Sequence, residues 1–292
     1  MQEYLAGKIR NVVLVGHGGS GKTSLAEVLA HTCGASTRLG KVDEGNTISD
    51  YDEEEIKRKI SINTSLVPVE WQGHKINILD TPGYADFVGE ILGAVRVADA
   101  AIVVVDAVSG VQVGTELVWQ YLAEAKLPRL VLVNKMDREN VNPESVLAGL
   151  REAFGEKLVP FQLPLGVAAG FSGVVDLLKG MTFTKGNQGN PGFPAESAEL
   201  VAPLRQELVE MAAEADDELL MKYLEGEELA QEEMAKGLRE AVRKGEVVPV
   251  AYASSLGDIA IAAILNYIAE LLPAPGDCAR PATDAAGGAM EL

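Results

Sequence analysis

The residues best suited to chemistry lie in a glycine-rich stretch near the start of the chain. Between the apolar run 12–15 and a predicted helix, the sequence reads Gly16-His17-Gly18-Gly19-Ser20-Gly21-Lys22-Thr23. Glycines let successive backbone N–H groups turn toward an anion, a lysine ammonium reaches the outer phosphates, and a threonine hydroxyl is placed to coordinate Mg²⁺. A glycine-rich turn without a ligand is the alternative, but the flanking strand and helix favour a phosphate-binding loop for a nucleoside triphosphate.

A second chemical group follows the apolar run 75–79 and reads Asp80-Thr81-Pro82-Gly83. Because an α/β sheet presents its ligands at the carboxyl ends of its strands, we expect Asp80 to hold Mg²⁺ there, directly or through water. Gly83 can offer its backbone N–H to a terminal phosphate and can change conformation when that phosphate leaves. By itself, this tetrapeptide is equally compatible with an ordinary turn.

Base recognition is the chemistry expected of a later polar turn, which reads Asn134-Lys135-Met136-Asp137. The Asp137 carboxylate can accept two hydrogen bonds from the N1–H and exocyclic amine of guanine, a pair that adenine does not offer. Asn134 and the Lys135 stem would complete the pocket, and an ATP-binding site is the less favoured alternative. Near the end of the chain, backbone N–H groups could approach the guanine oxygen at Ser254, Ser255 and Leu256.

The elements that must position these groups alternate between strands and helices. Apolar runs predict strands at 100–105, 129–133 and 247–252, and a hairpin at 65–71 and 75–79. Helical periodicity covers 22–31, 111–125 and 259–272. The polar segment 34–60 is expected to be a mobile loop or a weak helix. This order is typical of an α/β fold of the P-loop NTPase type, with a doubly wound, mostly parallel sheet.

The chain divides into a nucleotide-binding core and an insertion. We expect the first part of the core at 1–158, an inserted α+β subdomain at 159–246, the last strand and helix of the core at 247–273, and a linker or tail at 274–292. Within the insertion, strands are expected at 159–165 and 173–183, a loop at 186–194 and helices over 196–244. The segment 196–233 holds 13 acidic and two basic residues. It is either a solvated helix face or a docking surface for a basic partner.

Composition limits the possible classes of protein. The 292 residues carry a formal net charge of −18, which argues against a free-standing nucleic-acid binder and so against direct sequence-specific binding to nucleic acid. The two cysteines, Cys33 and Cys278, lie far apart and indicate neither a disulfide framework nor a zinc site. No apolar stretch approaches the ~18 residues of a membrane span. We therefore expect a cytoplasmic, monomeric protein without a membrane partner.

With these residues in place, the chain resembles the GTP-binding domain of elongation factor G and related ribosome-dependent translational GTPases. The resemblance covers essentially the whole length and includes the insertion, at 159–164 and 173–177. It implies GTP or GDP and Mg²⁺ as cofactors and the ribosome as a partner of a longer parent protein, of which this chain is the first domain. It also implies that the acidic helices 196–233 dock to a basic protein of the ribosomal stalk.

The resemblance assigns further roles to single residues. It implies that Arg58 to Ile62 belongs to the first switch, and that Ser61 occupies the position of a Mg²⁺-coordinating threonine, which gives a metal set of Thr23, Ser61 and Asp80. Tyr84 occupies the position of a histidine that orients the attacking water, beside Lys22 and Gly83 as the other catalytic candidates. Gly18 replaces an apolar residue that screens that water, and Gly19 replaces an aspartate. The chain therefore looks like a divergent paralogue within its family.

Two hypotheses follow for function. The first is a GTPase domain whose hydrolysis is stimulated by the ribosome and drives a conformational change in two switch segments. The second is a GTP-binding regulatory module that occupies the ribosome with weak or no productive hydrolysis. The water-orienting group affects the rate much more than binding, so Tyr84 decides between them. A tyrosine hydroxyl can hydrogen-bond a water, but its reach differs from that of histidine.

Overall fold

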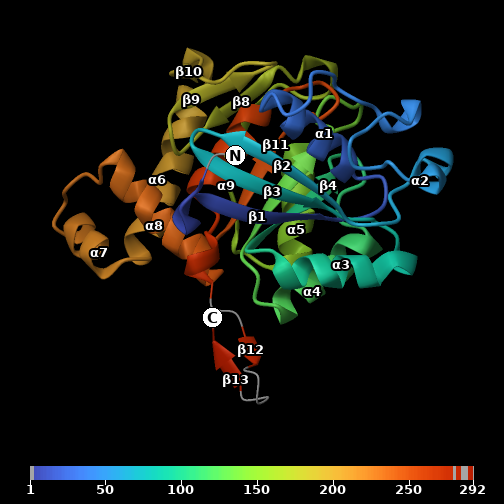
Figure 1. Cartoon of the computed structure of the whole chain (residues 1–292). Helices are drawn as coiled ribbons and strands as arrows, with labels where there is room; N and C mark the ends of the chain where they lie inside the picture. Colours follow the sequence, from blue (N-terminus) through green and yellow to red (C-terminus); the bar gives the residue numbers. More distant parts are fainter. Residues whose placement is uncertain (1–2, 279–280, 284–288, 292) are drawn as a thin grey trace.

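The fold is built on a seven-stranded sheet in the order β2-β3-β1-β4-β5-β11-β6 (Figure 1). This computed structural model describes residues 3–278, 281–283 and 289–291. Every neighbouring pair in the sheet is parallel except β2 and β3, which form an antiparallel hairpin. The strands are β1 (Ile9–Val15), β2 (Ser65–Trp71), β3 (His74–Asp80), β4 (Ala100–Asp106), β5 (Arg129–Asn134), β6 (Leu158–Pro160) and β11 (Val248–Tyr252).

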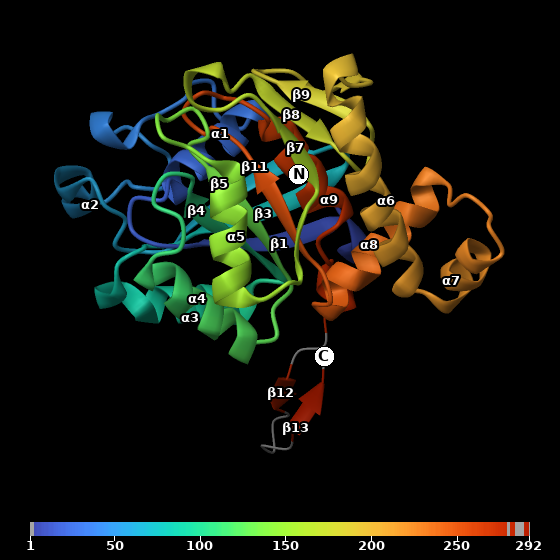
Figure 2. The same ribbon diagram turned by 180° about the vertical axis from the view of Figure 1, so that it is seen from behind.

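Helices cover both faces of this sheet. On one face α1 packs against α9, and the opposite face, turned toward the viewer in Figure 2, carries α3, α4 and α5. Their bounds are α1 (Lys22–Thr32), α3 (Val88–Val97), α4 (Val113–Glu124), α5 (Pro143–Phe154) and α9 (Ile261–Glu270). The doubly wound, mostly parallel α/β architecture predicted from the sequence is therefore confirmed.

Burial explains the two kinds of strand. Every residue of β4 is buried, as expected for a central parallel strand with helices on both faces. In β2, at the sheet edge, buried and exposed residues alternate strictly, because only one of its faces meets the core. The carboxyl ends of β1, β3, β4 and β5 lie at one edge of the sheet, which brings the predicted chemical groups together.

The insertion forms a second, antiparallel sheet in the order β10-β9-β8-β7, together with three helices. Its elements are β7 (Gln162–Leu165), β8 (Gly173–Asp176), β9 (Met181–Thr184), β10 (Asn190–Pro191), α6 (Ala198–Glu214), α7 (Asp217–Leu224) and α8 (Gln231–Lys244). Helices over 196–244 were predicted. The range 159–165, expected as a strand of the insertion, is divided: β6 joins the main sheet beside β11, and only β7 belongs to the second sheet. The range 173–183, expected as a strand, holds both β8 and β9. In the second range, the Lys179 N–H donates to Asp176 Oδ1 (2.8 Å) and turns the chain.

The polar segment 34–60 contains one short helix, α2 (Glu53–Arg58), within irregular chain. Short 3₁₀ helices lie at Ala6–Lys8, Val42–Glu44, Ala85–Phe87, Ala168–Gly170, Ala195–Ser197 and Pro275–Asp277. In the predicted tail, β12 (Pro281–Thr283) and β13 (Ala289–Glu291) pair antiparallel, and 279–280, 284–288 and 292 lie outside the described residues. Among the described helices, none is long and apolar enough to span a bilayer.

Candidate nucleotide site

The glycine-rich loop joins the end of β1 to the start of α1 at Lys22. Gly16, Gly19 and Gly21 have φ angles of 147°, 80° and 99°, which favour glycine. Space is limited as well, because a Cβ on Gly21 would lie 2.5 Å from Asn134 Nδ2, and one on Gly16 would overlap the Val104 carbonyl. The loop is therefore packed against β4 and against the end of β5.

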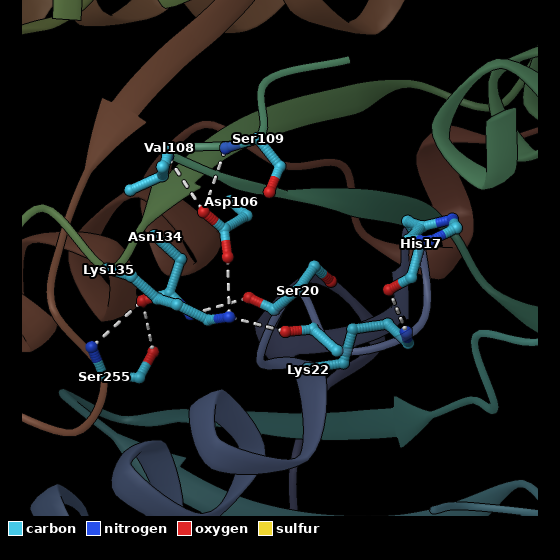
Figure 3. A network of polar contacts seen from close by, with 10 residues as sticks. His17, Ser20, Lys22, Asp106, Val108, Ser109, Asn134, Lys135 and Ser255 are labelled. Atoms are coloured by element: carbon cyan, nitrogen blue, oxygen red, sulfur yellow. Dashed lines mark hydrogen bonds and ion pairs between the residues drawn. The ribbon is translucent and has the colours of Figure 1, made fainter. Parts of the chain in front are cut away.

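The Lys22 ammonium lies inside this loop. Its side chain is buried, and Nζ donates to the carbonyls of Gly16 (3.0 Å) and His17 (3.2 Å), as Figure 3 shows for His17. Burial lowers the pKa of Lys22 to about 8, although the carboxylates of Asp80 and Asp50 act in the opposite direction. A desolvated cation among backbone groups is suited to an anionic ligand. His17 itself faces α4, where its Nδ1 accepts from the Gly114 N–H (3.3 Å).

Asp80, at the end of β3, is fully buried, and neither of its carboxylate oxygens has a partner with hydrogen-bond geometry among the described residues. Burial raises its pKa to about 6, while the nearby hydroxyls of Ser49 and Thr23 and the Lys22 ammonium lower it. Thr81 and Pro82 are buried beside it, and Thr81 donates to the Leu14 carbonyl (2.6 Å). Buried polar groups in proteins are nearly always paired, so this carboxylate is a candidate to bind an ion.

The residues around Asp80 fit a magnesium ion. Thr23 Oγ1 lies 2.9 Å from Ser61 Oγ, so the serine predicted for the first switch contacts the end of the glycine-rich loop. Asp50 is buried nearby, and burial raises its pKa while the Ser61 hydroxyl lowers it. Hydroxyl and carboxylate oxygens are the ligands that Mg²⁺ prefers. The described residues hold no group of three or more His, Cys, Asp or Glu side chains arranged for a metal.

Asn134 and Lys135 connect the predicted base pocket to the phosphate-binding loop. Asn134 Nδ2 donates to the Ser20 carbonyl (3.1 Å), and its Oδ1 accepts from both the backbone N–H (3.0 Å) and the hydroxyl (2.9 Å) of Ser255. Lys135 Nζ donates to the Gly19 carbonyl (2.6 Å) and pairs with Asp106 Oδ2 (2.7 Å). Three loops therefore meet at two side chains (Figure 3).

Asp106 is a residue that the sequence analysis did not select. Its Oδ1 accepts from the Val108 N–H (2.8 Å) while Oδ2 binds Lys135, so the carboxylate fixes the lysine. Burial raises its pKa, but the hydrogen bond and charge of Lys135 lower it below the usual value. The signal was present in the sequence, because Asp106 follows a buried strand in the same way as Asp80.

A cavity of about 210 Å³ extends along the loop from the phosphate end toward the base end. Among the predicted site residues, it is lined by Gly18, Gly19, Gly21, Lys22, Thr23, Ser61, Gly83, Tyr84, Lys135 and Leu256. Met136 is buried beneath it, with its N–H donating to the Ala253 carbonyl (3.2 Å). Asp137 and Ser254 do not line this cavity. Asp137 is exposed beside it, whereas Ser254 is buried, and its hydroxyl accepts from the Gly257 N–H (3.0 Å).

Three glutamates accept hydrogen bonds from backbone N–H groups of the segment 40–64, and the sequence analysis selected none of them. Glu27 on α1 accepts from the Gly40 and Ile48 N–H groups (2.7 and 2.8 Å). Glu55 accepts from Ile62 and Asn63 (2.9 Å each), and Glu90 on α3 accepts from Thr64 (2.8 Å). Glu90 therefore connects Thr64, two residues after the predicted first-switch range 58–62, to α3.

Comparison with known proteins identifies the family. The model of the elongation factor Tu GTP-binding domain matches residues 7–274. The chain is 37% identical to an elongation factor G-like protein of Thermotoga maritima over 91% of its own length and 38% of the relative's. A crystal structure of a Thermus thermophilus protein is 42% identical with a TM-score of 0.87, over 93% of this chain and 41% of that one. The chain thus spans about two fifths of these relatives, and it belongs to the elongation factor Tu GTP-binding domain family, the GTP-binding domains of translational GTPases.

Proposed function

We propose that this chain binds GTP with Mg²⁺ and hydrolyses its terminal phosphate, as the GTP-binding domain of an elongation factor G-like translation factor acting on the ribosome in the cytoplasm. The observation that carries the proposal is the meeting of the buried Lys22, Thr23, Ser61 and Lys135 around one cavity. Asn134, the neighbour of Lys135, is joined to the same loop through the Ser20 carbonyl. This arrangement supplies phosphate, metal and base contacts in the order in which a nucleotide presents those groups.

In the reaction, the oxygen of a water attacks the γ-phosphorus, the bond to the β,γ-bridging oxygen breaks, and GDP, phosphate and a proton are released. Lys22 and the backbone N–H groups of the loop bind the phosphate oxygens, where negative charge accumulates. Thr23, Ser61 and Asp80 would hold Mg²⁺, which neutralises charge on the β- and γ-oxygens when bound. In this proposal, the Gly83 N–H orients the γ-phosphate and the Tyr84 hydroxyl orients the water.

Loss of the γ-phosphate would release the switches. Ser61 is joined to Thr23 by one hydrogen bond, and Thr64 is joined to Glu90 by two, since its hydroxyl also donates to the Glu90 carbonyl (3.2 Å). Removing the phosphate and weakening the metal site frees the first end of this connection, and the change reaches α3 through the second end.

The test is GTP hydrolysis by the full-length parent with and without ribosomes, together with GDP and GTP affinities measured with fluorescent nucleotides. The proposal expects tight guanine-nucleotide binding and turnover that rises when ribosomes are added. Binding without stimulation would refute ribosome-dependent hydrolysis. Asp137→Asn should weaken guanine binding, and undiminished GTP affinity in that variant would refute the assigned base pocket.

A GTP-binding regulatory module with little hydrolysis is the second candidate, and the identity of residue 84 favours it. Tyr84 is 44% exposed and lies on the switch segment after Gly83, so water reaches its side chain. Replacing Tyr84 with histidine separates the candidates. A large gain in turnover would support a module with impaired hydrolysis, and a loss would support tyrosine as a working group.

We further propose that the acidic helices 196–233 dock to a basic stalk protein. The segment lies on the insertion, away from the nucleotide site (Figure 1), and part of its charge is already paired, as in Lys222–Glu233 (2.8 Å). Complementary charge speeds encounter and is screened by salt. Association should therefore weaken with added salt and with Glu207→Lys and Glu210→Lys. Association that is unaffected by salt and by these substitutions would refute the proposed docking surface.

A further inference from the structure

The phenol ring of Tyr84 lies directly over Gly18 of the phosphate-binding loop. A Cβ added to Gly18 would lie 3.0 Å from the ring carbon Cζ and 3.1 and 3.2 Å from the two Cε atoms. These three atoms form the hydroxyl-bearing end of the ring. Since the hydroxyl oxygen is bonded to Cζ, it is one bond away from the ring atom nearest to the loop.

A side chain at residue 18 is restricted by this contact and not by the backbone conformation. Its φ angle lies outside the left-handed region, so the backbone alone would accept a side chain. The neighbouring Gly19 shows the reverse, because its φ is 80° while a Cβ there would meet no atom within 4 Å. At residue 18, a side chain therefore fits only if the ring of Tyr84 shifts by a few tenths of an ångström or more.

The residue before the tyrosine strengthens the seating of the ring. A Cβ on Gly83 would lie 2.8 Å from both the N and Cα atoms of Gly18 and would overlap the Lys22 ammonium. The chain at Gly83 thus packs closely against the loop at Gly18, and Tyr84 is the next residue. The tyrosine lines the nucleotide cavity on one side and a second, smaller cavity of about 140 Å³ on the other, among apolar side chains of α3 and α4 such as Ile91 and Val118.

We propose that Gly18 and Tyr84 form one functional pair in GTP hydrolysis, in which Gly18 is the positioning residue. The missing side chain of Gly18 seats the tyrosine over the loop. There, the ring shields the terminal phosphate from bulk water, and the hydroxyl holds the attacking water. This inference rests on the proposed GTPase function.

The pair makes a graded prediction. In Gly18→Ala the added Cβ lies at 3.0 Å, so the ring must shift by a few tenths of an ångström. In Gly18→Val the two methyl groups would occupy the space of the Tyr84 ring, so the ring must move away from the loop. A displacement of about 1 Å at a reacting group can cost roughly 100-fold in rate. The loss should therefore be small for alanine and large for valine, and only while the ring is present.

A double-mutant cycle tests this dependence. Turnover of saturating GTP is measured with ribosomes in the full-length parent for four proteins: the natural sequence, Gly18→Val, Tyr84→Ala and the double variant. We expect Gly18→Val to lower turnover by about 10-fold or more beside the natural tyrosine, but by less than about 2-fold in the Tyr84→Ala background. Equal factors in the two backgrounds would overturn the pair. Absence of hydrolysis in the natural protein would overturn the proposed function itself, and the pair's catalytic role with it.

A structural readout accompanies the kinetics. In protein labelled with 3-fluorotyrosine, the ¹⁹F resonance of Tyr84 is identified by its loss in Tyr84→Phe. Gly18→Ala should shift this resonance and Gly18→Val should shift it further. The matched control is Gly89→Ala on α3, where an added Cβ meets nothing within 4 Å, and it should leave the resonance in place. A resonance that ignores residue 18 would overturn the contact on which the pair depends, whatever the rates.

Discussion

The two ends of the nucleotide site are held together in different ways. At the base end, Asn134 is buried, and Asn134 and Lys135 reach the phosphate-binding loop through direct hydrogen bonds. At the proposed phosphate end, the Glu90 carboxylate accepts from the Thr64 N–H and so holds the segment after Ser61, and Tyr84 is half exposed. We infer that the proposed base end is preorganised for binding, whereas the proposed hydrolytic geometry depends on segments that can detach from their neighbours.

The largest effect on nucleotide affinity is expected from removing the Lys22 ammonium. Lys22→Met keeps an unbranched side chain but lacks the charge, so we expect GTP affinity to fall about 100-fold or more, since charge-assisted phosphate contacts are lost. GDP affinity should fall as well. Fluorescent-nucleotide titration measures both affinities, and circular dichroism checks that the fold persists. A change of less than about tenfold would show that the loop backbone binds phosphate without its lysine.

Asp106→Asn tests the preorganisation of the base end. The variant keeps the shape of residue 106 but removes its negative charge. In the natural protein, Asp106 Oδ2 lies 2.7 Å from Lys135 Nζ, and the Asp106 side chain is only 10% exposed. We expect GDP to bind about 10- to 30-fold more weakly, because the lysine ammonium is left without its ion partner. Glu240→Gln at the exposed Arg243 pair is the matched control, with no change in affinity. Unchanged binding in Asp106→Asn would contradict a base end fixed by this ion pair.

The pH dependence of GTP affinity tests the phosphate end in the natural protein, through the titration of Lys22. Burial lowers the pKa of Lys22 to about 8, so in the free protein the ammonium is lost as pH rises through that value. Binding an anion needs the charged form, and GTP affinity should therefore fall as pH rises from about 7 to about 9, by up to about tenfold. Lys22→Met should flatten this profile. A natural protein whose affinity does not change over this range would argue against Lys22 as the titrating group.

The smallest effect on nucleotide affinity should come from breaking the contact between Thr64 and Glu90. Glu90→Ala removes the acceptor of the Thr64 N–H, which is part of the contact between the first switch and α3. Loss of one charge-assisted hydrogen bond of this kind costs about 1.5–3 kcal/mol locally. We expect faster hydrogen exchange over 60–66 and several-fold slower hydrolysis, with GDP affinity within about twofold of the natural value. Slower exchange, or a matching loss of GDP affinity, would contradict the proposed separation.

Sequence reasoning was strongest where chemistry is local. The loop 16–23, Asp80 and the Asn134 turn each follow an apolar run, and parallel strands carry all three to one edge of the sheet. Glu27 and Glu90 escaped because their partners lie 13 to 26 residues away, in segments without periodicity. The identity of a glutamate does not show which distant backbone N–H group it will bind.

The unpredicted helices fall into two kinds. Helix α3 contains Gly89 and Gly93, which lower helix propensity, and it forms because its apolar side packs against the sheet. Helix α5 carried a readable start signal, since the Asn142 side chain accepts from the Ser145 N–H and Pro143 takes the first helical position. The contact between Gly18 and Tyr84 lay beyond sequence reasoning, because only the fold shows that the ring fills the space above the glycine.

The most direct test of the division between binding and hydrolysis is Tyr84→Phe, which removes a single hydroxyl and keeps the ring over Gly18. GDP affinity and ribosome-stimulated GTP turnover are measured on the same full-length protein. We predict an affinity within about twofold of the natural value and a turnover at least about tenfold lower, since a water-orienting group contributes to rate far more than to binding. Unchanged turnover would contradict the account, because the hydroxyl would then have no part in the reaction.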